Sequence, residues 1–76
     1  MSPTRQAIWQ GERLKVTRKA RGLTMFELAA KVGCDRPLVS MWESGKSTPS
    51  GHFLVSLGIA LNKEPKEFYA LEEGVQ

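Results

Sequence analysis

Apolar and polar positions follow a helical spacing in short stretches of the chain, and these stretches are separated by glycine, proline and helix-capping residues. The pattern predicts five helices, at residues 11–21, 25–32, 36–44, 51–61 and 65–71. No stretch alternates apolar and polar residues for long enough to predict a strand. We therefore expect an all-α fold.

The predicted helix boundaries carry residues that suit them. Thr24 and Glu27 have the spacing of a capping box, in which each side chain bonds the other residue's backbone N–H. Asp35 is the expected N-cap of the third helix, and Pro37 falls in its first turn, where a missing N–H removes no intrahelical hydrogen bond. Gly33 closes the second helix in a turn of about three residues, which predicts two helices joined by a tight turn.

The inward positions of these helices predict a small apolar core. In the third helix, Val39 and Trp42 lie three residues apart and should face inward. Ser50 is the expected cap of the fourth helix, in which Gly51 and Gly58 each weaken the helix by about 1 kcal/mol at an interior position. The last two helices contribute further core candidates: Leu54, Leu57, Ala60, Leu61, Phe68 and Leu71.

The composition excludes several classes of protein and site. A single cysteine, Cys34, cannot form an internal disulfide and is expected to be a small apolar filler; with one histidine, His52, the chain has too few ligands for a structural zinc site. No apolar run approaches the roughly 18 residues that span a bilayer, and no signal peptide is evident. We expect a cytoplasmic protein without membrane contact. Trp9 is either a packing residue of the first helix or an exposed interface residue.

The net charge of +3 is unevenly distributed along the chain. Residues 1–50 hold nine Lys and Arg against four Asp and Glu, whereas residues 51–76 hold two against four. The basic half suits a polyanion such as nucleic acid, and the alternative is a solvated basic surface. We divide the 76 residues into an N-terminal arm (1–10), one helical domain (11–71) and a short acidic tail (72–76).

A combination of short motifs resembles one known family. The chain contains "RGLT", "ELA", "VG" and "WESGK" followed by a proline, and later "LVSLGIALNKEPKEFY". In this combination, residues 11–69 resemble the lambda-repressor-like (Cro-type, XRE) helix-turn-helix family. The resemblance implies a compact five-helix DNA-binding domain with the helix-turn-helix at the second and third helices.

The resemblance also implies roles for particular residues. Arg18 and Glu43 take the positions of a partly buried ion pair that orients the third helix, so Glu43→Ala should lose far more stability than Glu64→Ala. The family's base-reading positions fall at Arg36, Pro37, Ser40 and Met41.

These four side chains differ in what they can read. Arg36 can donate two hydrogen bonds to guanine O6 and N7, although it could instead contact phosphate or be a solvated arginine. Ser40 bonds several bases and specifies little by itself. Pro37 and Met41 offer apolar surface, which suits either a thymine methyl group or a protein interface.

The expected phosphate contacts surround this helix. Side-chain candidates are Arg13, Lys31, Ser44, Lys46 and Ser47. Backbone amides at Thr24, Met25 and Asp35, near the starts of the second and third helices, are further candidates, because helix N-termini attract anions. Many family members carry a phosphate-contacting glutamine where this chain has Met25, which places that contact in question.

Two functions of different class follow from these observations. The first is a phage-type transcriptional repressor that binds double-stranded DNA through the third helix, as a homodimer on an inverted repeat, without catalysis or cofactor. The chain also resembles modules fused to metallopeptidase-like regulatory domains, and antitoxins. The second is a protein-interaction module that keeps the fold but has lost DNA reading, because Met25, Pro37 and Met41 make the expected DNA face unusually apolar.

Overall fold

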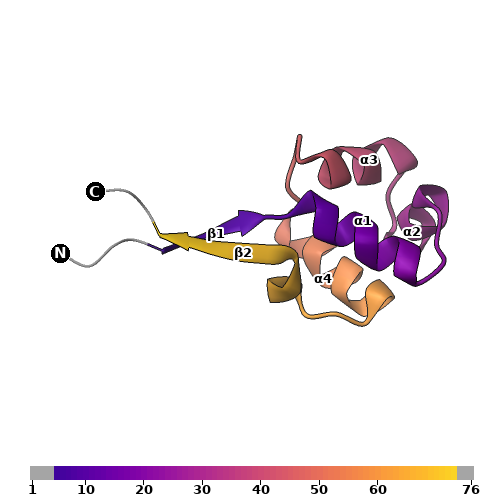
Figure 1. The fold of residues 1–76 in the computed structure, drawn as a ribbon. Helices are drawn as coiled ribbons and strands as arrows, with labels where there is room; N and C mark the ends of the chain where they lie inside the picture. Colours follow the sequence, from indigo (N-terminus) through magenta and orange to yellow (C-terminus); the bar gives the residue numbers. More distant parts are fainter. Residues whose placement is uncertain (1–4, 74–76) are drawn as a thin grey trace.

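A computed structural model of the chain describes residues 5–73. Four helices pack into one body, and a two-stranded ribbon projects from it (Figure 1). The elements in chain order are β1 (Arg5–Trp9), α1 (Gly11–Ala20), α2 (Met25–Val32), α3 (Arg36–Ser44), α4 (Gly51–Leu61), the 3₁₀ turn η1 (Pro65–Phe68) and β2 (Tyr69–Glu73).

The helices begin where their capping residues predict. The Thr24 hydroxyl accepts a hydrogen bond from the Glu27 amide at 3.0 Å, and Glu27 Oε1 accepts one from the Thr24 amide at 2.8 Å. The second of these bonds holds the pKa of the Glu27 carboxyl below its usual range. Asp35 Oδ1 accepts from the Leu38 amide at 3.2 Å. Ser50 is at the N-cap of α4, but its side chain makes no capping hydrogen bond.

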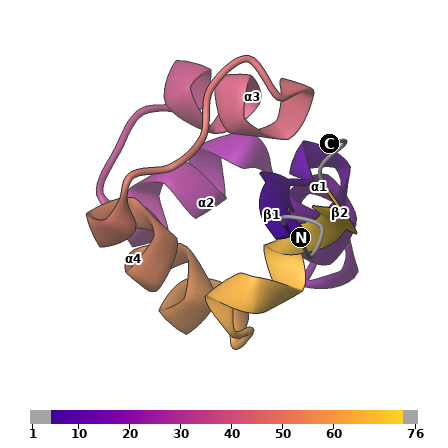
Figure 2. The same cartoon turned by 90° about the vertical axis from the view of Figure 1, so that its left-hand side faces the viewer.

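The core lies at the centre of the four helices, which surround it in the view along the ribbon (Figure 2). The buried apolar side chains of the described residues come from every helix and from η1: Leu14, Leu28, Ala29, Val32, Val39, Trp42, Leu57, Leu61 and Phe68. Leu54 and Ala60 pack against this cluster from its edge. The predicted core is therefore confirmed except at Leu71, which is 68% exposed.

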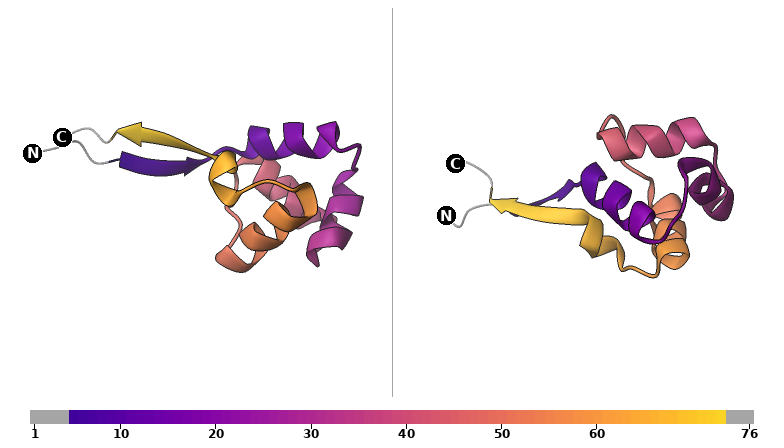
Figure 3. Two further views of the ribbon diagram at one scale, coloured as in Figure 1. Left: turned by 90° about the horizontal axis from the view of Figure 1, so that it is seen from below. Right: turned by 45° about the vertical axis from the view of Figure 1, so that its right-hand side comes forward.

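The predicted fifth helix and the predicted absence of strands are wrong, although the mainly helical class is confirmed. Residues 65–71 form one 3₁₀ turn and then enter β2, which pairs antiparallel with β1 (Figure 3). The register places Ala7 opposite Leu71 and Trp9 opposite Tyr69. Each strand has five residues, and its partner lies at the other end of the chain, so local periodicity carries no sign of the pairing.

The ribbon includes residues from outside the expected helical domain. Residues 5–9 of the expected arm form β1, and residues 72 and 73 of the expected tail belong to β2. Residues 1–4 and 74–76 lie outside the described part of the chain.

Trp9 joins the ribbon to the helical body. Its ring packs edge-on against Tyr69 at a centroid distance of 5.5 Å and lies 5.9 Å from the ring of Phe68. Its indole Nε1–H donates a hydrogen bond to the backbone oxygen of Trp42 at 2.8 Å. Trp9 is thus a packing residue that links β1 to both η1 and α3.

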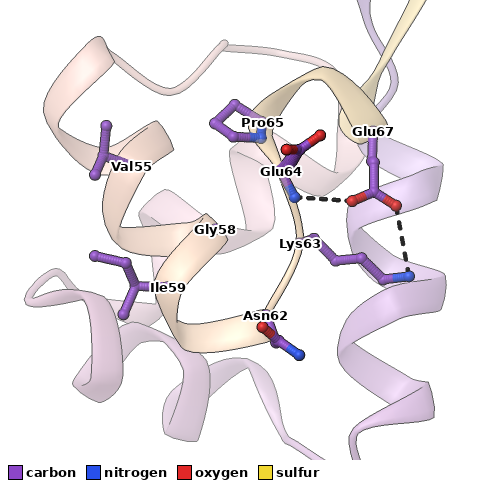
Figure 4. A pocket seen from close by; sticks show the side chains of 8 residues that line it. All are labelled: Val55, Gly58, Ile59, Asn62, Lys63, Glu64, Pro65 and Glu67. Carbon is purple, nitrogen blue, oxygen red and sulfur yellow. Dashed lines mark hydrogen bonds and ion pairs between the residues drawn. The ribbon is translucent and has the colours of Figure 1, made fainter.

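Two buried glycines permit close approaches between elements. A Cβ atom on Gly11 would overlap the carbonyl oxygens of Trp42 and Glu43, so α1 can begin here, against the end of α3, only with glycine. A Cβ atom on Gly58 would lie 2.6 Å from the oxygen of Lys63. Figure 4 shows this second approach, where the chain turns back over α4 towards Pro65. Gly58 is therefore required by packing, although it lowers helix propensity.

Candidate functional site

The helices α2 and α3 are joined by a three-residue turn. Gly33 has a φ of +83°, in the left-handed region, and its amide donates to the oxygen of Ala29 at 2.9 Å, as does the Cys34 amide at 3.0 Å. Asp35 then caps α3. The half-buried Cys34 side chain packs against the core, and burial raises the pKa of its thiol, which favours the protonated form.

An ion pair between Arg18 and Glu43 fixes the end of α3 against α1. Arg18 Nε and Nη2 donate to the two carboxylate oxygens of Glu43 at 2.6 and 3.1 Å, and Nη1 donates to the oxygen of Leu23 at 2.8 Å. The two residues are 6% and 8% exposed. The hydrogen bond with Glu43 raises the pKa of the Arg18 guanidinium. The pair implied by the family resemblance is present, and it limits the orientations that α3 can adopt.

The outer face of α3 presents the four predicted base-reading residues. Arg36 and Pro37 are exposed in the first turn, Met41 is 41% exposed one turn later, and Ser40 is half-buried between them. Arg36 makes no ion pair with any side chain of residues 6–72. Its guanidinium is therefore available to a ligand that approaches this face.

Part of the predicted phosphate-binding set lies at the two ends of this face. Ser44 and Lys46 are exposed at the end of α3, where Gly45 turns the chain with a φ of +82°. The amide of Thr24 is already bonded to Glu27 within the capping box. Met25 is half-buried and packs against the core.

Three other residues predicted to contact phosphate have different surroundings. Arg13 Nη1 donates to the oxygen of Tyr69 at 2.7 Å, at the base of the ribbon. Lys31 lines a hollow with residues of α4, among them Ser56 and Ile59. The hydroxyl of Ser47 is buried without a hydrogen-bond partner in the described structure. The structure thus places Arg36, Pro37, Ser40 and Met41 on the outer face of α3 and Ser44 and Lys46 at its end, and the phosphate contacts of the other three stay predictions.

Phe26 was not among the predicted site residues. It lies in the first turn of α2 and is 70% exposed. Phe26 is one of six large apolar side chains that are exposed in the described part of the chain, and singly exposed apolar residues are ordinary on a protein surface. The sequence could have indicated this exposure, because Phe26 lies off the inward face formed by Leu28, Ala29 and Val32.

Residues 5–73 hold neither a membrane-spanning helix nor a cluster of metal ligands. No helix there has both the length and the apolar character needed to cross a membrane. No group of three or more His, Cys, Asp or Glu side chains in the same residues is placed to hold a metal ion.

Comparison with known proteins places this geometry among helix-turn-helix regulators. The sequence profile of the family described as Helix-turn-helix matches residues 14–68. The chain is similar in structure to the P22 c2 repressor protein in complex with a synthetic operator, with 31% identity over 76% of this chain and 88% of that chain, at a TM-score of 0.75. No curated protein sequence is similar enough to be counted as a relative.

Two bacterial regulators are also similar to this chain. The restriction-modification controller protein C.AhdI from Aeromonas hydrophila is 38% identical over 76% of this chain and 88% of that chain, with a TM-score of 0.72. SinR of Bacillus subtilis, the master regulator for biofilm formation, has been solved in complex with DNA; it is 34% identical over 72% of this chain and 89% of that chain, with a TM-score of 0.68.

Proposed function

Because the chain belongs to the Cro/C1-type helix-turn-helix family, we propose that it is a DNA-binding transcriptional regulator that reads a specific duplex sequence through α3 in the major groove. The observation that carries this proposal is the buried Arg18–Glu43 pair, which holds α3 in one orientation while its outer face stays exposed. A reading helix needs both properties, since hydrogen bonds to base edges require a fixed geometry.

The chemistry of the outer face gives each side chain a role. Arg36 donates two hydrogen bonds to guanine O6 and N7, which gives about 1 to 3 kcal/mol of discrimination against another base. Met41 and Pro37 contact thymine methyl groups, because both offer apolar surface of the right size. Ser40, which is half-buried, contributes an adaptable hydrogen bond.

Phosphate contacts orient α3 on the duplex. Ser44 and Lys46 hold the backbone near the end of α3, and the amides at the start of α2 hold it at the other end. These contacts are independent of sequence and weaken with salt.

The regulator acts as a two-fold dimer on an inverted repeat, in the manner of a phage repressor. Two α3 helices then enter successive major grooves about 34 Å apart. Occupying promoter DNA represses transcription without any chemical step. Support for this comes from the similarity to the P22 c2 repressor, which was solved with an operator.

A second candidate function is a protein-interaction module, favoured by the exposure of Phe26 and Met41 at 70% and 41%. Salt separates the two functions. For DNA binding, log K falls by about 0.9 per phosphate contact for each log unit of salt, whereas an apolar interface barely responds.

The test is selection of a random duplex library by the purified chain, followed by salt titration on the selected sequence. We expect an inverted repeat and a steep salt dependence. Arg36→Ala should lose preference at one base position in each half-site, weakening binding by about 1 to 3 kcal/mol. The matched control is Lys66→Ala, which removes the same charge from η1 and should keep the preference. Selection of no sequence, with binding of protein instead, would favour the second function.

A further inference from the structure

The ribbon has two edges, and the pairing pattern determines which backbone groups point out of each. The amide of Gln10 donates to the oxygen of Phe68 at 2.8 Å, directly in line with the β1–β2 register. Hydrogen-bonded and non-hydrogen-bonded pairs alternate along an antiparallel ladder. Ile8 and Ala70 therefore bond each other, whereas the N–H and C=O groups of Ala7 point away from β2.

The edge of β2 is already protected. Its outward carbonyl at Tyr69 accepts a hydrogen bond from Arg13 at 2.7 Å. Glu72, next to the outward-facing Leu71, adds a charge of the kind that discourages edge pairing. The edge of β1 differs, because residues 6–9 are uncharged and Ala7 is exposed with a small side chain.

We propose that β1 pairs antiparallel with β1 of a second copy of this chain, forming a four-stranded sheet across a two-fold axis at Ala7. This inference deepens the proposed function, which requires a dimer. In that register the N–H of each Ala7 meets the C=O of the other, so the contact is self-complementary. A two-stranded ribbon is marginally stable in water, and four strands are more stable.

Charge selects β1 over β2 for this contact. Pairing of two β2 strands about Leu71 would place the two copies of Glu72 diagonally across adjacent strands, where like charges repel. Pairing about Ala7 puts two β1 strands between them, about 14 Å apart at a strand spacing of about 4.8 Å.

The dimer geometry suits DNA. From Ala7 to Gln10, each chain runs about 10 Å, so the two helical bodies begin about 20 Å apart, at opposite ends of the sheet. The end of α3 lies close to the start of the helical body in each copy, because the Trp9 indole N–H donates a hydrogen bond to the oxygen of Trp42. This leaves room for a spacing of about 34 Å between reading helices.

The two α3 helices of the dimer also lie on the same face of the four-stranded sheet. Figure 1 views the ribbon nearly edge-on with α3 on one side of it, and Figure 3 shows the two strands side by side. The two-fold axis of an antiparallel strand pair is perpendicular to the sheet. Rotation about this axis therefore leaves the second α3 on the same face of the sheet as the first.

The test is sedimentation of the purified chain without DNA, up to about millimolar concentration, with Ala7→Pro as the variant and Leu71→Pro as its matched control. Each substitution removes one outward N–H and leaves the β1–β2 hydrogen bonds in place, since proline is tolerated where the N–H faces solvent. We expect a dimer whose dissociation constant rises at least about tenfold in Ala7→Pro and stays unchanged in Leu71→Pro. Circular dichroism verifies that both variants are folded.

A second measurement covers the case in which Ala7→Pro disrupts the ribbon. In a Cys34→Ala background, Ala7→Cys should form a disulfide-linked dimer under mild oxidation, because the two Cα atoms lie about 5.5 Å apart. Leu71→Cys should not. A monomer at every concentration, or equal effects at the two edges, would overturn the proposal. Because no DNA is present, this outcome is independent of whether the chain binds DNA.

Discussion

Arg18 and Glu43 are both charged and almost fully buried, so each depends on the other. The guanidinium fork meets both carboxylate oxygens, and its remaining donor reaches the oxygen of Leu23. In water each group would be solvated, whereas in the fold neither has another partner of opposite charge among the side chains of residues 6–72. Removal of one member therefore leaves a buried charge unpaired.

Glu43→Ala should lower the free energy of unfolding by about 3 to 5 kcal/mol, measured by urea denaturation. Glu64→Ala should cost less than about 1 kcal/mol, because Glu64 pairs with Lys66 on an exposed surface. The double variant Arg18→Met, Glu43→Leu should be more stable than Glu43→Ala, since no buried charge is left. Equal losses for Glu43→Ala and Glu64→Ala would contradict the burial of the pair.

Single residues also show the limit of prediction from sequence. The family motif located Arg18, Glu43 and the exposed face of α3, because these positions are fixed by spacing within the motif. It gave no sign that the Arg13 guanidinium donates to the oxygen of Tyr69, because that partner belongs to a strand absent from the prediction. Where a long side chain points depends on tertiary neighbours.

At the scale of elements, α4 contains two glycines, of which one is required by close packing and the other is not. Gly58 lies against the oxygen of Lys63, whose amide in turn donates to the oxygen of Gly58 at 2.9 Å. Gly51 has nothing within 4 Å of its Cβ position. The same substitution should therefore have opposite effects at the two ends of one helix.

Gly58→Ala should destabilise the domain by about 1 to 3 kcal/mol, because the added methyl group forces the turn over α4 to move. Gly51→Ala should be neutral or stabilise by up to about 1 kcal/mol, since alanine restricts the unfolded chain and favours helix. Thermal melts of the two variants decide the matter. A stabilised Gly58→Ala would show that the turn is free to shift.

The helices were predictable and the ribbon was not, for a physical reason. The start of α2 is determined by residues within one turn of it, at Thr24 and Glu27, and α3 begins in the same way at Asp35. The sequence "PKEFYAL" suits a helix locally, but it is held in β2 by pairing with β1 at the other end of the chain. A short strand whose partner is this distant leaves no local pattern to read.

At the scale of the whole molecule, the ribbon closes the described chain into a ring, since its two strands are the first and last elements. Bringing distant segments together costs chain entropy, and contacts between distant segments form slowly. The helices contact neighbours that are closer in sequence. We therefore expect the helical body to form first and the ribbon to close last.

If the ribbon closes last, it should also open more easily than the helical core. Amide hydrogen exchange should be faster in β1 and β2 than in α1 or α3, because the ribbon can open without unfolding the core. Uniform protection would show that the ribbon and the core open together. Substitutions in the strands should accelerate unfolding while leaving the folding rate unchanged. The helix α3 thus stays folded on a timescale on which the two strands of the ribbon separate and rejoin.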